Sequence, residues 1–205
     1  YFYTGKNFVA QPWSPEILRI KAEVEALTGF KFDAALLQWY PSGSTTLGWH
    51  YDKIGQSSDP EAIIASLSFN EVPGEDRIFR YRSRWNPETG EQFTGKDYSR
   101  SNRGQTVDQG GSYPVQDFVD FPLGNGDLLL MMEGVNANWE HMVLGAGGYS
   151  GRINITFRQI DIPTGSQSRV SPQVPGTPAE TGPVVIKHSD DLNPVLSNFE
   201  RSPFE

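Results

Sequence analysis

Cysteine is absent from this chain of 205 residues, and histidine and methionine occur only three times each. Without a thiol, the protein cannot form disulfides, use a thiolate nucleophile, or bind zinc or an iron–sulfur cluster through cysteine. Any metal centre must therefore use His, Asp or Glu as ligands. The histidines available for that purpose are His50, His141 and His188.

Positive charge is also in short supply, and long apolar runs are missing. Lys and Arg number 17 against 25 Asp and Glu, so the formal net charge is -8. This balance excludes a generally basic surface, and a nucleic acid would have to bind a local patch. No apolar run is long enough to cross a bilayer, and residues 1–7 do not resemble a signal peptide. We expect a soluble monomer without a membrane partner, in the cytoplasm or nucleus.

The order of predicted elements is one helix followed by many short strands. Ser14 and Pro15 are typical of a helix start, and apolar residues recur at helical spacing from Ile17 to Leu27, before Gly29. Segments with strand character follow at 34–40, 46–52, 62–69, 77–82, 127–132 and 153–160. Turn-forming residues separate these segments, which favours a mainly β (α+β) fold, an antiparallel sandwich or jelly roll backed by the N-terminal helix.

The length predicts one domain, and two polar segments do not fit its strand pattern. Residues 1–162 would form the domain. The stretch from about 83 to 119 is too long for a hairpin turn and is either a substrate-covering lid or a solvated insertion. From 163 to 205 the chain is rich in Pro, Ser, Thr and Gly, and this C-terminal extension either wraps the domain or stays mobile.

His50 and Asp52, followed much later by His141, have the order and chemistry of an iron-binding facial triad. Two histidines and one carboxylate occupy one face of Fe(II) and leave other positions open for a co-substrate and O₂. On a strand, residues i and i+2 point to the same side, so His50 and Asp52 could reach one metal ion. The alternative is a hydrogen-bonded His–Asp pair at a strand end, with His141 half-buried elsewhere.

Polar and apolar residues alternate in the last predicted strand. The polar set is Arg152, Asn154, Thr156 and Arg158, and the apolar set is Ile153, Ile155 and Phe157. Two arginines on one face are costly unless they meet an anion, and their planar forks suit a dicarboxylate. The alternative is a ladder of salt bridges on an exposed edge strand. Together with the triad, the strand favours an oxidoreductase in which Fe(II) reacts with a 2-oxo acid and O₂.

Several segments of the chain resemble the AlkB-like branch of the Fe(II)- and 2-oxoglutarate-dependent dioxygenases. The matching sequences are YFYTG (1–5), LLQWY (36–40), GWHYD (48–52), IIASLSF (63–69), GDLLLM (126–131) and RINITFR (152–158). The resemblance implies a double-stranded β-helix, or jelly roll, with catalytic iron ligands His50, Asp52 and His141. It also implies that Tyr40, Arg152, Asn154 and Arg158 bind 2-oxoglutarate. Gln38 stands where many members of the family carry Asn, and we expect it to contact the same co-substrate.

The resemblance implies oxidative dealkylation, or demethylation, of N-alkylated nucleobases in nucleic acid. Such a base must be flipped out or single-stranded, and must stack on aromatic side chains. We expect Tyr3, Trp49, Tyr51 and Arg80 to bind the substrate, with neighbouring arginines forming a basic stripe. Lys53-Ile54 departs from the acidic residue that base-repairing members carry there. The alternatives are hydroxylation, desaturation or cyclisation of a small molecule such as an amino acid, and a non-catalytic binding module, which an intact triad disfavours.

Overall fold

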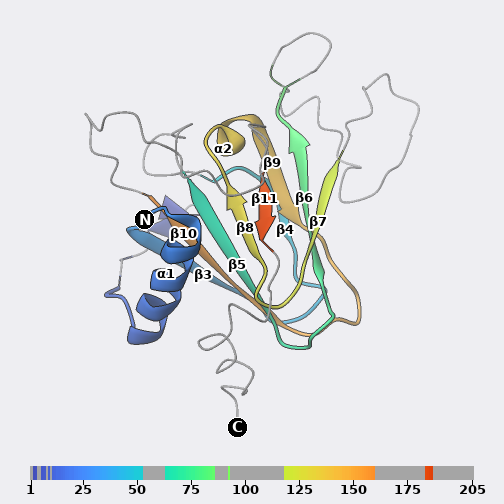
Figure 1. Ribbon diagram of the computed structural model, residues 1–205. Coiled ribbons are helices and arrows are strands. Elements are labelled where there is room, and N and C mark those ends of the chain that lie inside the picture. Colours follow the sequence, from blue (N-terminus) through green and yellow to red (C-terminus); the bar gives the residue numbers. More distant parts are fainter. Residues whose placement is uncertain are drawn as a thin grey trace.

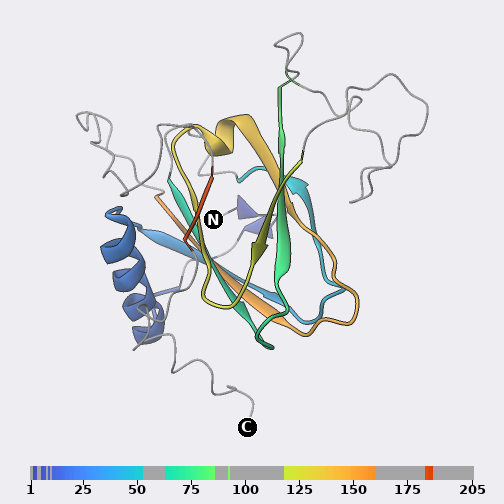
Figure 2. The same cartoon turned by 45° about the vertical axis from the view of Figure 1, so that its right-hand side comes forward.

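The computed structural model describes residues 11–52, 63–85 and 118–159, the short segments 2–3, 6–7 and 183–186, and the single residues 9 and 92. Its main feature is a pair of facing antiparallel sheets, with one helix on the outer side of the larger sheet (Figures 1 and 2). This arrangement confirms the predicted jelly roll backed by an N-terminal helix. Among the described residues, no helix is both long and apolar enough to cross a membrane.

Helix α1 (Pro15–Thr28) begins and ends where the sequence predicts. The Ser14 hydroxyl accepts a hydrogen bond from Ile17 N at 3.3 Å, and Gly29 ends the helix with a φ of 74°. A left-handed residue at that position favours glycine, because a Cβ would clash there. Ile20 and Val24 on one face of α1 are buried against the larger sheet.

The strands form a five-stranded sheet and a four-stranded sheet, together with a two-stranded hairpin. In spatial order, the larger sheet contains β11 (Val184–Ile186), β8 (Leu128–Met131), β5 (Ile64–Asn70), β10 (Arg152–Arg158) and β3 (Ala34–Tyr40). The smaller contains β4 (Leu47–His50), β9 (Trp139–Val143), β6 (Arg77–Ser83) and β7 (Val119–Leu123). The hairpin is β1 (Phe2–Tyr3) with β2 (Lys6–Asn7), and the short helix α2 (Val135–Asn138) joins β8 to β9.

Strand β10 lies inside the larger sheet, between β3 and β5, and therefore separates two different environments. Ile155 and Phe157 face α1 and belong to the core beneath the helix, where Phe157 packs on Phe32. The alternate residues Arg152, Asn154, Thr156 and Arg158 are buried on the other face, toward the smaller sheet. The alternative that the arginines lie on an exposed edge strand is therefore wrong. The alternation along β10 places its apolar side chains toward α1 and its polar side chains between the two sheets.

Some predicted element bounds need correction. The segment at 46–52 becomes β4, which ends at His50, so Asp52 lies beyond the strand. Strands β7 and β9 were not predicted, because β7 contains Pro122 and β9 mixes Glu140 with His141 in a short run. In the C-terminal extension, β11 pairs with β8, as the wrapping alternative requires. The rest of that extension, and most of the polar stretch at 83–119, lies outside the described residues.

Candidate active site

A cavity of about 290 Å³, including its opening to solvent, lies between the two sheets. The side formed by the smaller sheet is apolar and is lined by Leu47, Phe79 and Val143, and Met131 adds an apolar side chain from β8 of the larger sheet. The opposite side is polar and is lined mainly from β3, β5 and β10, by Gln38, Tyr40, Ser66, Asn154, Thr156 and Arg158. The three predicted metal ligands lie in the same cavity.

The two histidines come from neighbouring strands and sit directly opposite one another. In the β4–β9 pair, His50 is in register with His141, and their ring centroids are 4.2 Å apart. Opposed residues of an antiparallel pair point to the same face, so both imidazoles enter the cavity. His141 also stacks on Phe79, with ring centroids 4.9 Å apart, which fixes the plane of its ring.

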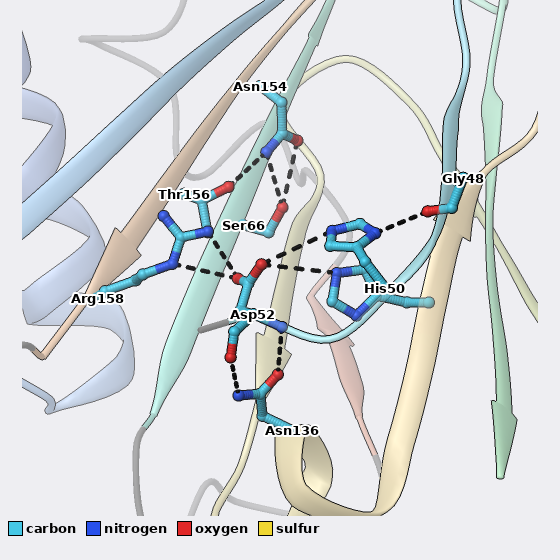
Figure 3. Close-up of polar contacts among 9 residues, drawn as sticks. Gly48, His50, Asp52, Ser66, Asn136, Asn154, Thr156 and Arg158 are labelled. Atoms are coloured by element: carbon cyan, nitrogen blue, oxygen red, sulfur yellow. Dashed lines mark hydrogen bonds and ion pairs between the residues drawn. The ribbon is translucent and has the colours of Figure 1, made fainter. Parts of the chain in front are cut away.

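Asp52 completes a group of ligand atoms that lie within 4.8 Å of one another. Its Oδ1 is 3.7 Å from His50 Nε2 and 4.0 Å from His141 Nε2. Strand periodicity does not place this carboxylate, because β4 ends at His50. Instead, the Asp52 N–H donates to Asn136 Oδ1 at 2.8 Å, and Asn136 Nδ2 donates to the Asp52 carbonyl at 2.7 Å (Figure 3).

Hydrogen bonding and burial prepare the three side chains to act as ligands. His50 Nδ1 lies 2.8 Å from the Gly48 carbonyl, which can only accept, so Nδ1 carries the proton and Nε2 offers its lone pair. Burial, assisted by the neighbouring His50, lowers the pKa of His141 to about 3, which keeps its ring neutral. Burial would raise the pKa of Asp52, but the charge and hydrogen bonds of Arg158 together with the two neighbouring histidines outweigh it and lower that pKa to about 2.

Arg158 contacts one oxygen of the metal-binding carboxylate and leaves the other exposed to the histidines. Its Nη2 and Nε donate to Asp52 Oδ2 at 2.7 and 3.2 Å (Figure 3). Oδ1 is then the oxygen that faces His50 and His141. The set of two imidazoles and one carboxylate oxygen fits Fe(II), which such facial triads bind. Arg158 therefore contacts a candidate metal ligand directly, which the sequence did not predict.

Arg152 lies next to two of the lining residues, Tyr40 and Asn154, and has unused hydrogen-bond donors. Its Nη2 donates to Ser68 Oγ and Asn154 Oδ1, both at 2.8 Å, and its guanidinium lies 5.2 Å from the Tyr40 ring centre. Nε and Nη1 are buried without a hydrogen-bond partner in the described part of the chain. Burial lowers the pKa of Arg152 to about 10, so it is still cationic at neutral pH. A carboxylate would satisfy both the charge and the unused donors.

A hydrogen-bond network joins Arg152 to the middle of the polar wall. Asn154 Nδ2 donates to Ser66 Oγ at 3.0 Å and to Thr156 Oγ1 at 2.9 Å (Figure 3). Gln38 stands opposite Asn154 in the β3–β10 register and lines the cavity. The sequence did not single out Ser66 or Ser68, although their alternation in the predicted strand at 62–69 is a signal that could have found them. For Asn136, no sequence signal points to its role.

Two of the four predicted substrate-binding residues, Trp49 and Arg80, lie on the outer face of the smaller sheet. Arg80 lies on the face of β6 opposite His141, because Tyr81 is the β6 residue paired with His141. Its Nε and Nη2 donate to Asp120 at 2.5 Å. Trp49 stacks on Phe118 on that same outer face, with ring centroids 5.7 Å apart. The side chain of Tyr3 lies outside the described part of the molecule.

The arginines of β6 and the adjoining Arg84 do not form a continuous free stripe. Arg77 points inward and donates to the carbonyls of Ser42, Thr45 and Leu144. Arg82 pairs with Glu140 at 2.7 Å and lies over the Trp49 ring. Arg84 donates to the Ala137 carbonyl, and its guanidinium lies 4.1 Å from the Tyr51 ring centre.

The comparisons with known proteins agree with this geometry. The family model for the 2OG-Fe(II) oxygenase superfamily matches residues 1–158, so the chain belongs to that superfamily. Membership brings Fe(II), 2-oxoglutarate and O₂ as the cofactor and co-substrates, and the His50–Asp52–His141 group fits the iron.

Similar curated proteins place the chain among the AlkB-like members, as the sequence motifs predict. Alpha-ketoglutarate-dependent dioxygenase alkB homolog 3 of Bos taurus is 30% identical, over 77% of this chain and 48% of its own length. DNA oxidative demethylase ALKBH2 of Homo sapiens is 29% identical, over 78% and 52%. Uncharacterized protein R406 of Acanthamoeba polyphaga mimivirus is 29% identical, over 77% and 65%. The chain thus spans about half the length of the two animal relatives.

Proposed function

We propose that this protein is an Fe(II)- and 2-oxoglutarate-dependent dioxygenase that removes alkyl groups from nucleobases in nucleic acid by oxidation. The observation that carries the proposal is one cavity with a metal-binding triad and a buried arginine with unused donors nearby. The names of two relatives, a DNA oxidative demethylase and an alpha-ketoglutarate-dependent dioxygenase, support the choice of substrate and co-substrate.

Each group in the cavity has a distinct part in the proposed reaction. His50, Asp52 and His141 would hold Fe(II) through Nε2, Oδ1 and Nε2. Bound iron supplies O₂ activation and C–H oxidation, coupled to decarboxylation of the 2-oxo acid. Arg152 and Tyr40 bind the co-substrate's distal carboxylate, and Asn154 keeps Arg152 oriented. The neutral imidazole of His141 and the ionised Asp52 need no proton loss before they bind metal.

The apolar wall supports selective oxidation. Phe79 and Val143 line the side of the cavity next to His141, and Phe79 also orients that ring. An apolar lining excludes water and strengthens the electrostatic contacts inside the site. Tyr81, in register with His141, is fully buried, and burial raises its pKa well above the usual range. Its phenol therefore stays protonated and adds no negative charge beside the metal ligands.

We also propose that Tyr3, Trp49, Tyr51 and Arg80 contact the substrate. The structural reasons differ from one residue to the next. Tyr51 directly precedes the metal-binding Asp52, so its half-buried ring is the best placed of the four to meet a substrate. Trp49 and Arg80, on the outer face of the smaller sheet, could contact only a nucleic acid strand that extends beyond the cavity. Together with Phe118, they provide aromatic rings for base stacking and a cation for phosphates, as proteins that bind single-stranded nucleic acid do.

Oxidation of a small molecule is the second candidate function. The pairing of Arg80 with Asp120 and of Arg82 with Glu140 favours it, because these ion pairs weaken the basic surface that a polynucleotide requires. In this case the same metal and co-substrate groups would act, with an amino acid or a related small acid in place of the base.

Succinate formation from 2-oxoglutarate tests the proposal. Purified protein with Fe(II), ascorbate and O₂ would be supplied with a methylated single-stranded oligonucleotide, its unmethylated counterpart, or a panel of amino acids and small acids. We expect stimulation by the methylated strand together with loss of its methyl group. Stimulation by a small acid alone would replace the dealkylase proposal with the second candidate. His50→Ala and Asp52→Ala should abolish turnover, and retained turnover in either would refute the ligand assignment.

A further inference from the structure

Asp52 differs from the two histidines in how its position is fixed. His50 and His141 lie on paired strands, whereas Asp52 follows the end of β4 and has no strand partner. Asp52 is only 4% exposed, so any movement of its main chain would displace a buried charge. The contacts that hold the Asp52 backbone therefore help to fix the position of this carboxylate.

The Asn136 side chain supplies those contacts with both ends of its amide. Oδ1 accepts from the Asp52 N–H at 2.8 Å, and Nδ2 donates to the Asp52 carbonyl at 2.7 Å. This reciprocal pairing resembles one rung of an antiparallel ladder, with an amide side chain in place of the neighbouring strand (Figure 3). Asp52 and Asn136 are 84 positions apart in sequence, so the pairing fastens two distant segments at the site.

The short helix α2 is built to present this amide. Gly134, with a φ of 82°, starts the turn, and Val135 is fully buried between the sheets. The Asn138 N–H donates to the Gly134 carbonyl at 3.0 Å and closes the turn through the backbone, while the exposed Asn138 side chain adds a second bond to the same carbonyl. Asn136 is only 2% exposed, and both of its polar atoms are used on Asp52.

We propose that Asn136 is a positioning residue of the metal site, which clamps the Asp52 main chain so that Oδ1 faces His50 and His141. Arg158 holds the other carboxylate oxygen, so the two contacts fix Asp52 from the backbone and from the side chain. The inference rests on the proposed iron site. Partners that orient metal ligands typically change metal affinity by about 10- to 100-fold when they are removed.

Metal affinity, rather than turnover, is the measurement that tests the clamp. Mn(II), a redox-stable substitute for Fe(II), would be titrated into wild type, Asn136→Ala, Asn136→Ser, Asn138→Ala and His50→Ala, with free Mn(II) followed by electron paramagnetic resonance. Asn138 belongs to the same helix but is exposed and touches neither Asp52 nor a histidine in any described contact. We expect Asn136→Ala to weaken Mn(II) binding about 10- to 100-fold and Asn138→Ala to leave it unchanged within about twofold.

A second variant, Asn136→Ser, and a second metal, Co(II), provide independent measurements of the same contact. Serine has one hydroxyl with a shorter reach, so it cannot form both bonds to Asp52, and we expect weakened Mn(II) binding in this variant too. Co(II) absorption should show a changed ligand field in Asn136→Ala and Asn136→Ser but not in Asn138→Ala. Wild-type affinity and spectrum in a folded Asn136 variant would overturn the clamp. If instead wild type and His50→Ala bind Mn(II) equally, the metal site and the proposed function fail together.

Discussion

Single residues divide the candidate site into the His50–Asp52–His141 group and the surroundings of Arg152, which lies beside the cavity-lining residues Tyr40 and Asn154. Arg152 is buried, cationic at neutral pH, and holds two donors without a described partner. An anion that binds these donors gains more free energy than one at an ordinary surface contact, because an unpaired buried charge is costly. The site is thus preorganised for an anion before any co-substrate arrives.

Arg152→Lys should raise the KM for 2-oxoglutarate by at least about tenfold, with a much smaller change in kcat. Lysine keeps the charge but loses the planar fork that pairs with a carboxylate, and such binding acts equally before and during the reaction. Succinate formation at increasing 2-oxoglutarate concentration measures both constants. Arg80→Lys, on the outer face, is the matched control. A KM unchanged in Arg152→Lys would place the distal carboxylate elsewhere.

Arg158 contacts the His50–Asp52–His141 group, and its replacement should affect more than co-substrate binding. Arg158→Ala leaves a buried carboxylate unpaired, a change that typically costs about 3–5 kcal/mol. We expect a lower thermal midpoint, and an increase of at least about tenfold in the Fe(II) concentration needed for half-maximal turnover. Succinate formation across an Fe(II) series at saturating 2-oxoglutarate separates this effect from co-substrate affinity. A change confined to the 2-oxoglutarate requirement would contradict the metal-site role.

At the scale of elements, Glu25 fastens the end of α1 to the chain leading into β3. Its carboxylate accepts from Lys21 Nζ at 2.6 Å, from Lys31 Nζ at 2.9 Å and from Phe32 N at 2.9 Å. Burial would raise the pKa of Glu25, but these bonds outweigh it and lower the pKa to about 2. The helix that covers the larger sheet is therefore held at its C-terminal end by one carboxylate.

Glu25→Gln should lower the free energy of unfolding by about 1–2 kcal/mol at neutral pH. The folded pKa is depressed below the value of about 4.3 for an unfolded glutamate, so the stabilisation is present above pH 4 to 5. It is lost as the pH falls toward 2, and the difference from wild type should shrink there. Urea unfolding near pH 7 and near pH 2.5 measures this, with the exposed Glu23→Gln as control. A difference independent of pH would show that the charge of Glu25 is not responsible.

Predictability from the sequence also differs between elements. Helix α1 and strand β3 match their predictions because Ser14, Pro15 and Gly29 mark the helix ends and apolar residues fill the strand. The candidate metal-binding group could be predicted because only three histidines exist and Asp52 follows His50 at His-x-Asp spacing. Arg80 could not be placed, since its side of β6 depends on the register with β9. Asn136 was missed for the same reason: a contact across 84 positions leaves no local pattern.

At the scale of the whole molecule, the larger sheet is completed by residues from the C-terminal extension. Strand β11 pairs with β8, with Val185 packed against the core between the sheets and Ile186 against the core beneath α1. Deleting residues 183–205 should expose the β8 edge and lower stability by about 1–3 kcal/mol. Thermal unfolding and size-exclusion chromatography test this, with deletion of 187–205 as the control. Equal stability of the two truncated proteins would contradict a structural role for β11.

Charge substitutions on the outer face of the smaller sheet can test whether a nucleic acid strand binds there. The net charge is -8, and on the outer face of the smaller sheet Asp120 holds Arg80 while Phe118 lies beneath the same guanidinium. If a strand crosses this face, Asp120→Asn should free Arg80 for a phosphate and tighten binding of a single-stranded oligonucleotide about two- to fivefold, with a steeper salt dependence. Glu16→Asn removes the same charge from the first turn of α1 and should change affinity far less. Fluorescence anisotropy over a salt series measures both variants. Equal affinities for the two would mean that the strand does not touch this face, and that the cavity mouth alone selects the substrate.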